Sequence, residues 1–112
     1  MKPMKPILVV ALLIMGMSTT FSQELFDAIK NNDLPEVKTL LERNPGLLSI
    51  RDESGNTPLH LAVRQKETET VSYLLGKGAD VNSVNRNLQS PLHFAASLGS
   101  ADIAKLLIGK RG

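Results

Sequence analysis

The chain contains two nearly identical stretches that begin thirty-three residues apart. Residues 57–62 read TPLHLA, and residues 90–95 read SPLHFA. The similarity continues downstream, because YLLGK at 73–77 returns as LLIGK at 106–110. A fixed period of this length is typical of stacked repeats, in which each unit buries its apolar face only against its neighbours. We therefore expect a row of equivalent units rather than one central core.

Each copy of the motif carries the signals that begin a helix. Pro58 and Pro91 suit the first helical position, where a backbone N–H would have no partner in any case. Thr57 and Ser90 precede them with a hydroxyl that can accept a hydrogen bond from the first turn. Apolar residues then recur at the spacing of one helical face. The helices expected in these two units are 58–65, 69–76, 91–98 and 102–108.

A period of thirty-three residues with the pattern T-P-L-H-x-A resembles the ankyrin repeat family. The loop at 78–82 reads GADVN and matches that family's loop in full. The resemblance implies an all-α solenoid of about three helix-turn-helix repeats, joined by β-hairpin-like fingers. Lys66 departs from the pattern, because the family usually has glycine there, and we expect an altered or strained turn. Leu88 replaces the glycine that Gly55 provides one repeat earlier, as either a packed finger residue or an exposed apolar contact.

The segment before the first motif reads as an atypical first repeat. Residues 24–41 contain two apolar helical patterns, separated by Asn-Asn-Asp at 31–33 and ended by Asn-Pro-Gly at 44–46. They align with the second repeat at an offset of thirty-four, so the loop at 45–51 carries one extra residue. The expected boundaries are 1–22 for a leader and 23–112 for the repeat domain, with repeats at about 23–55, 56–88 and 89–112.

The first twenty-two residues have the order of a secretory signal peptide. Lys2 and Lys5 make a basic start, residues 7–15 are an unbroken apolar run, and residues 16–22 form a small, polar end. We therefore expect cleavage before Gln23 and an exported protein, periplasmic or secreted. The rival interpretation is a membrane anchor, but a spanning helix needs about 20 apolar residues and this run is shorter.

Removal of the leader changes the charge balance. The chain has 13 Lys plus Arg and 11 Asp plus Glu, and Lys2 and Lys5 leave with the leader, so 13 − 2 = 11 residues of each sign remain. Bulk charge therefore gives no reason to expect a nucleic-acid partner, or a membrane partner once the leader is removed. Cysteine is absent, which excludes disulfides, thiolate nucleophiles and Cys-ligated metals.

The sequence holds no recognisable catalytic or cofactor motif. A nucleophile elbow, a Walker motif, a Gly-rich dinucleotide loop and HExxH are all missing. His60 and His93 are the only histidines. Equivalent positions on stacked helices lie about 8–10 Å apart, which is poor geometry for two imidazoles that must each approach one zinc ion to about 2 Å. In ankyrin repeats this histidine bonds the Thr or Ser of its motif and neighbouring backbone, so we expect a scaffold role, no cofactor and no metal.

The candidate binding residues are the positions that the repeat pattern leaves unconstrained. In ankyrin stacks the fingers and the first helix of each repeat line one concave side, which forms an extended binding surface. The matching residues here are Glu53, Ser54 and Asn56 on the first finger, Arg86, Asn87 and Gln89 on the second finger, and Arg64, Gln65, Ser97 and Leu98 on the first helices.

These features favour an exported, non-enzymatic protein–protein interaction module that binds a protein partner through the concave surface. The alternative is an accessory or stabilising subunit of a neighbouring exported enzyme, held in an obligate complex. A third reading, a small exported enzyme, is disfavoured by the missing motifs.

The third repeat does not look like a cap. Its second helix keeps apolar residues on more than one face, at Ile103, Leu106, Leu107 and Ile108, and its first helix keeps Leu98. A stack must end in a polar outer surface, or its last apolar face stays wet. We therefore expect this end to be the weakest part of the fold, and to fray or to be covered by a partner or a second copy.

Overall fold

The computed structural model describes the backbone of residues 17–111 and the side chains of residues 21–109. All regular structure in that range is helical. The elements are α2 (Met17–Lys30), α3 (Leu34–Arg43), the 3-10 helix η1 (Pro45–Ser49), α4 (Pro58–Arg64), α5 (Thr68–Gly76), α6 (Pro91–Leu98) and α7 (Ala101–Arg111). The predicted helix pattern and the all-α class are confirmed.

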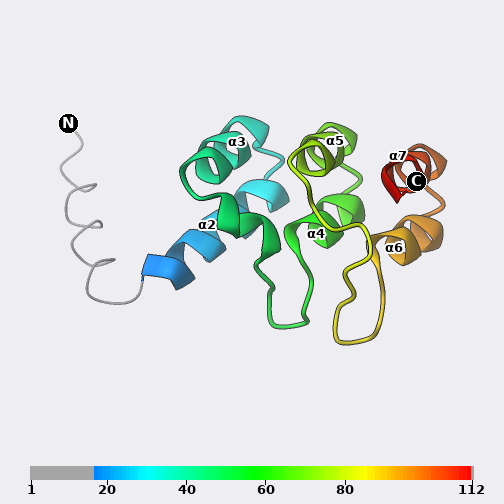
Figure 1. Cartoon of the computed structure of the whole chain (residues 1–112), viewed down its shortest axis with the longest axis horizontal. Helices are drawn as coiled ribbons and strands as arrows, with labels where there is room; N and C mark the ends of the chain where they lie inside the picture. The colour runs from blue at the N-terminus through cyan, green and yellow to red at the C-terminus, as the bar shows by residue number, and fades with distance from the viewer. Residues whose placement is uncertain (1–16, 112) are drawn as a thin grey trace.

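Three helix pairs stand side by side in a row (Figure 1). Helices α2, α4 and α6 form one layer, and α3, α5 and α7 form the other. Helix α4 contacts both α2 and α6, whereas α5 contacts α7, so each pair packs mainly on its neighbours. Two fingers extend from the layer of α2, α4 and α6 (Figure 1): finger 1 is residues 51–56 and finger 2 is residues 84–89.

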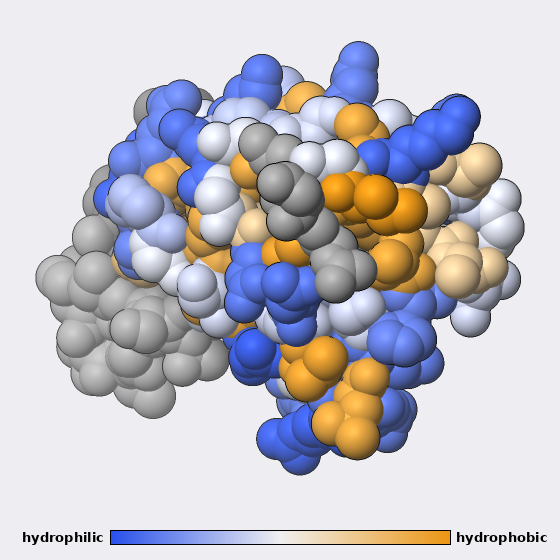
Figure 2. All heavy atoms as spheres, turned by 45° about the vertical axis from the view of Figure 1, so that its right-hand side comes forward, coloured by the Kyte–Doolittle hydropathy of each residue, from blue (hydrophilic) through white to orange (hydrophobic). Residues whose placement is uncertain are grey.

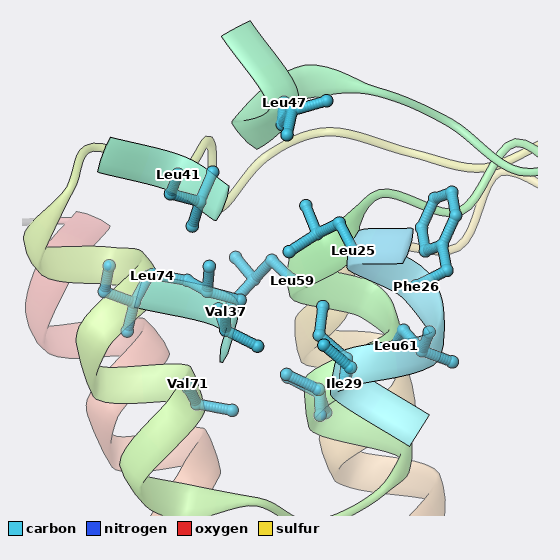
Figure 3. Close-up of a cluster of buried hydrophobic side chains, with 14 of the residues drawn as sticks. Leu25, Phe26, Ile29, Val37, Leu41, Leu47, Leu59, Leu61, Val71 and Leu74 are labelled. Carbon is cyan, nitrogen blue, oxygen red and sulfur yellow. The ribbon is translucent and has the colours of Figure 1, made fainter. Parts of the chain in front are cut away.

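The predicted apolar faces meet in one continuous core (Figure 3). Leu25 and Ile29 of α2, Val37 of α3, Leu59 of α4 and Leu74 of α5 are all buried there. The third repeat extends the same cluster through Ala95, Ile103 and Leu107. The apolar residues of the outer helices recur at the spacing of one helical face. Helix α4, in the middle of its layer, is instead buried along its whole length except for Arg64.

The helix starts of the two motif repeats are held by reciprocal caps. Thr57 Oγ1 accepts the His60 backbone N–H at 3.3 Å, and His60 Nδ1 accepts the Thr57 N–H at 3.1 Å. Ser90 and His93 repeat the arrangement at 3.3 and 2.9 Å. These are capping boxes in which histidine takes the place usually held by Glu or Gln.

The two departures from the repeat pattern both fall on left-handed backbone. Lys66 has a φ of 59°, close to the 68° of Gly99 in the equivalent turn of the next repeat. Leu88 has a φ of 62°, at the position where Gly55 has 82°. A side chain is disfavoured in this region because its β-carbon crowds the following carbonyl. Of the two outcomes expected at Lys66, the turn is therefore strained and not altered. Leu88 was expected to be either packed in the finger or exposed, and it is exposed, with 74% of its surface accessible.

The extra residue of the first repeat lies in a folded segment rather than in an open loop. Residues 45–49 form η1, which begins at a proline and is capped by the Asn44 side chain, an acceptor from Gly46 N at 3.2 Å. Leu47 of η1 is buried in the core. The added length therefore contributes packing to the stack.

The predicted leader reaches the described part of the chain only at its end. Helix α2 begins at Met17, so the expected cleavage point before Gln23 falls within this helix, and Phe21 packs against the core. The basic start and the apolar run of the leader lie outside the described residues. No helix within residues 17–111 is both long and apolar enough to cross a membrane.

His60 joins α4 to finger 2. Its ring is fully buried, and Nε2 lies 2.8 Å from the carbonyl oxygen of Gln89. Because Nδ1 accepts the Thr57 N–H, Nε2 carries the ring proton and donates it to that carbonyl. The scaffold role predicted for His60 is confirmed. His93 makes the same contacts to its own Ser90, but nothing among the described residues bonds its Nε2.

We predict that His60→Ala lowers the free energy of unfolding by about 1–3 kcal/mol, because the buried carbonyl of Gln89 and the N–H of Thr57 each lose a partner. Chemical denaturation of both proteins measures the difference. The matched control is His93→Ala, which removes an exposed ring from the same motif and should cost less than about 1 kcal/mol. Equal losses in the two variants would contradict the prediction.

We also predict that stability falls as the pH is lowered through the range below 6.5. Burial lowers the pKa of His60 below its ordinary value of 6.5, and Arg51 acts in the same direction, whereas the bond to Gln89 opposes the shift. The unfolded chain therefore binds more protons than the folded one in this range, and acid favours unfolding. Denaturation midpoints measured against pH should fall less steeply in His60→Ala than in the parent; equal slopes would exclude His60 as the cause.

Candidate functional site

The tips of both fingers are built by the same side-chain turn. Asp52 Oδ1 accepts the backbone N–H groups of Ser54 and Asn56, each at 2.9 Å. One period later, the Asn85 Oδ1 accepts the N–H groups of residues 87 and 89 at 2.9 and 3.0 Å. Each finger also closes through a backbone bond between residues 52 and 56 or 85 and 89. The tip backbone is thus held from within, although no β-ladder is assigned in residues 17–111.

The two fingers are bonded to each other. The Arg86 N–H donates to the Ser54 carbonyl at 3.0 Å. Arg51 Nη1 donates to the carbonyls of Gly55 and Val84 at 2.8 and 2.7 Å, which bridges the fingers at their base. A β-carbon on Gly55 would lie 3.0 Å from the backbone nitrogen of Arg86, so glycine permits this close approach. The fingers therefore form one ledge with a fixed spacing.

Asn56 must be removed from the predicted binding surface. Its side chain is only 3% exposed, and its Oδ1 accepts the Asn85 Nδ2 at 2.8 Å. It joins the fingers and is out of a partner's reach. Gln89 is half-buried and serves the same scaffold, because its Oε1 accepts from Asn85 at 3.1 Å and its carbonyl accepts from His60.

The other predicted finger residues do lie on the surface. Glu53 and Ser54 of finger 1 and Arg86 and Asn87 of finger 2 are exposed. Within the described part of the chain, the side chains of Glu53, Arg86 and Asn87 make no hydrogen bond or ion pair. A rigid ledge that carries uncommitted side chains can adapt its polar contacts to a partner at little backbone cost.

Helices α4 and α6, the inner helices, contribute a second row of residues beside the fingers. We call the fingers and this second row together the concave row. Arg64, Gln65 and Ser97 are exposed, and Leu98 is half-buried. The Arg64 guanidinium lies 5.8 Å from the ring centre of Phe94, which spans the step from α4 to α6. Gln65 also lines a separate hollow of 420 Å³, which lies between the turns that follow α2 and α4. Gln65 is therefore shared between the concave row and this second hollow.

Phe94 and Arg51 are site residues that sequence reasoning missed. Phe94 is half-buried and meets the His60 ring edge-on, with 5.3 Å between centres. Its signal was an aromatic residue at the place where Leu61 stands one repeat earlier. For Arg51 the sequence offered no comparable signal, because its role depends on a carbonyl 33 residues away.

A hollow of 540 Å³ opens where finger 1 meets α2 and α4. Phe26 and Leu61 supply its apolar wall, and Lys30 and Glu53 supply charge of opposite sign at its margin. This mixture suits the side chain of a protein partner, since an apolar anchor can enter while polar groups orient it. Within the described residues no three metal-binding side chains lie together.

Comparison with known proteins gives matches that rest on the repeats. A family model described as "Ankyrin repeats (3 copies)" matches residues 25–112. A human protein, transient receptor potential cation channel subfamily A member 1, is 42% identical over 65 residues, which is 58% of this chain and 6% of that protein. The ANK repeat-containing protein nipk-1 of Caenorhabditis elegans is 38% identical over 66% of this chain and 12% of its own length. Inversin of Gallus gallus is 33% identical over 84% of this chain and 8% of its own length.

The chain thus spans only a small part of each of these relatives, and their whole-protein activities do not transfer with the match. What does transfer is the repeat itself, because the family model covers nearly all of the described residues and the structure shows the helix pairs and fingers at the same period. The chain belongs to the ankyrin repeat family, whose members act as protein–protein interaction modules.

Proposed function

We propose that this chain is an exported, non-enzymatic module that binds a protein partner along the concave row of fingers and inner helices. The observation that carries the proposal is the ledge made by the two fingers. Its backbone is held by bonds within and between the fingers, while the side chains of Glu53, Arg86 and Asn87 make no hydrogen bond or ion pair within the described chain. Binding therefore requires little ordering of the site, which favours affinity.

The charges on the concave row and the hollow beside finger 1 indicate what kind of partner surface would fit. Glu53 and Lys30 flank the hollow, and Arg64 and Arg86 lie further along the row, so both signs of charge are present. Such a surface selects a partner with a complementary mixed pattern rather than a polyanion. The apolar wall at Phe26 and Leu61 favours one apolar side chain of the partner as an anchor.

Export is the second part of the proposal and rests on the leader pattern of residues 1–22. Cleavage before Gln23 removes Ser22, one of the residues that line the hollow, and leaves the remaining wall in place. An accessory role beside an exported enzyme is the alternative form of the same binding activity. The two differ in the partner, because an accessory subunit changes the stability or the activity of the enzyme that it holds.

We predict that charge reversal on the ledge weakens partner binding. Affinity capture from the exported fraction of the native cells supplies the partner, and titration then measures its dissociation constant. Glu53→Arg combined with Arg86→Glu should weaken binding at least about tenfold, as expected for changes at central interface positions. Glu69→Arg on α5, in the opposite layer, is the matched control and should leave the dissociation constant unchanged. Equal binding by all variants would refute the concave site.

We predict a mature form that begins at Gln23 and is found outside the cytoplasm. N-terminal sequencing of the protein from cell fractions measures this directly. A full-length species retained in the cytoplasm would contradict export, while leaving the binding experiment interpretable on its own.

A further inference from the structure

The outer face of the third repeat exposes groups that the second repeat buries. Leu75 is 4% exposed on α5, which α7 contacts, whereas its equivalent on α7, Ile108, is 55% exposed. Finger 2 shows the same contrast, since Leu88 is 74% exposed at the position of buried Gly55. Together with Val84, which is 40% exposed, Ile108 and Leu88 are the large apolar side chains that stand out among the described residues.

Figure 2 turns toward the viewer the side where the row of helices ends. With that side turned forward, orange surface appears over the helices and again on the fingers below, with blue surface between. We call this the end face and define it by Val84, Leu88, His93, Ala96 and Ile108. Their equivalents one repeat earlier either bond to finger 2, as Arg51 and His60 do, or are buried. The buried equivalents are Gly55, Val63 and Leu75.

The end face also carries an unused donor and an unused acceptor. One period earlier in the chain, His60 Nε2 donates to Gln89 and the Ser54 carbonyl accepts from Arg86. Their equivalents are His93 Nε2 and the Asn87 carbonyl, and neither has a partner within residues 17–111. Since His93 Nδ1 accepts the Ser90 N–H, its Nε2 carries a proton available for donation.

A protrusion and a hollow accompany these polar groups. Leu88 projects from the tip of finger 2 on left-handed backbone that disfavours a side chain. A hollow of 340 Å³ lies on the helices of the same repeat, and its apolar lining includes Leu92, Ala96 and Leu107, with His93 beside them. The exposed Leu88 costs stability and gains no burial from the described residues, so a contact with another molecule would stabilise it.

We propose that the end face binds a second copy of this chain across a twofold axis. A twofold interface uses one patch twice, so that patch must contain both members of every contact. The end face meets this condition, because it offers the Leu88 protrusion with the hollow at Leu92 and the His93 donor with the Asn87 acceptor. Each copy can place its finger over the hollow of the other.

Head-to-tail stacking of copies fits less well. Continuing the row would require the next copy to present a finger carbonyl to His93, as Gln89 presents its carbonyl to His60. Within residues 17–111 the two fingers follow η1 and α5, and they are already engaged, since finger 1 is bonded to finger 2 and the Gln89 carbonyl of finger 2 to His60. A closed dimer is therefore expected rather than an open chain of copies.

The test is sedimentation equilibrium of the protein purified after expression of the whole chain, over a wide concentration series. We expect a reversible monomer–dimer equilibrium with no larger species. Ile108→Glu should weaken dimerisation at least about tenfold, because it places a charge in the apolar contact. Leu88→Gly should also weaken it, while leaving the monomer's melting temperature equal or higher, since glycine relieves the left-handed backbone. Weaker dimerisation with an unchanged or higher melting temperature distinguishes loss of the interface from loss of the fold.

Arg64→Ala, on the concave row, is the control and should leave the dimer dissociation constant unchanged. A monomer at every concentration would overturn the proposal. So would open-ended growth beyond the dimer, or an association that both end-face variants leave intact, because another surface would then be responsible. None of these outcomes decides whether the concave row binds a partner, which the capture experiment tests separately.

Discussion

The hydrogen bond from His60 Nε2 to the Gln89 carbonyl connects finger 2, part of the proposed binding surface, to the buried helix α4. Finger 2 has no β-ladder, and its position depends on a few bonds to the preceding repeat. Because the ring is fully buried, its two nitrogens cannot bond to water, and both must form hydrogen bonds within the protein. The same ring therefore caps α4 and sets where the next finger stands, which places Arg86 and Asn87 beside finger 1.

A repeat stack gives one residue different duties in successive copies. His60 and His93 make the same local cap, yet only His60 is enclosed by a following repeat. Gly55 lies under finger 2, where a β-carbon would meet Arg86 at 3.0 Å, whereas Leu88 lies under nothing in the described chain. Stability in such a stack is a sum of contacts between nearest neighbours, and among the described residues the third repeat has such a neighbour on one side only.

The period and its caps predicted most of the fold. Helix bounds followed from Pro58, Thr57 and their equivalents, because local capping decides where a helix starts. The candidate site was predicted less completely. Asn56 looked like surface, and its burial comes from a bond to Asn85, 29 residues away. The position of a residue within the repeat predicts whether it belongs to a finger. It does not predict which finger side chains form the hydrogen bonds between the two fingers and are therefore buried.

Finger 2 belongs to both proposed surfaces, and this couples them. The exposed side chains of Arg86 and Asn87 belong to the proposed concave row, while Leu88, Val84 and the Asn87 carbonyl belong to the end face. Finger 1 is braced by a neighbour on its outer side, but finger 2 has none in the described chain. A second copy seated on Leu88 would restrain the segment that also presents Arg86, so dimerisation would reduce the ordering cost of partner binding. By linkage, a partner that orders finger 2 must favour the dimer to the same extent.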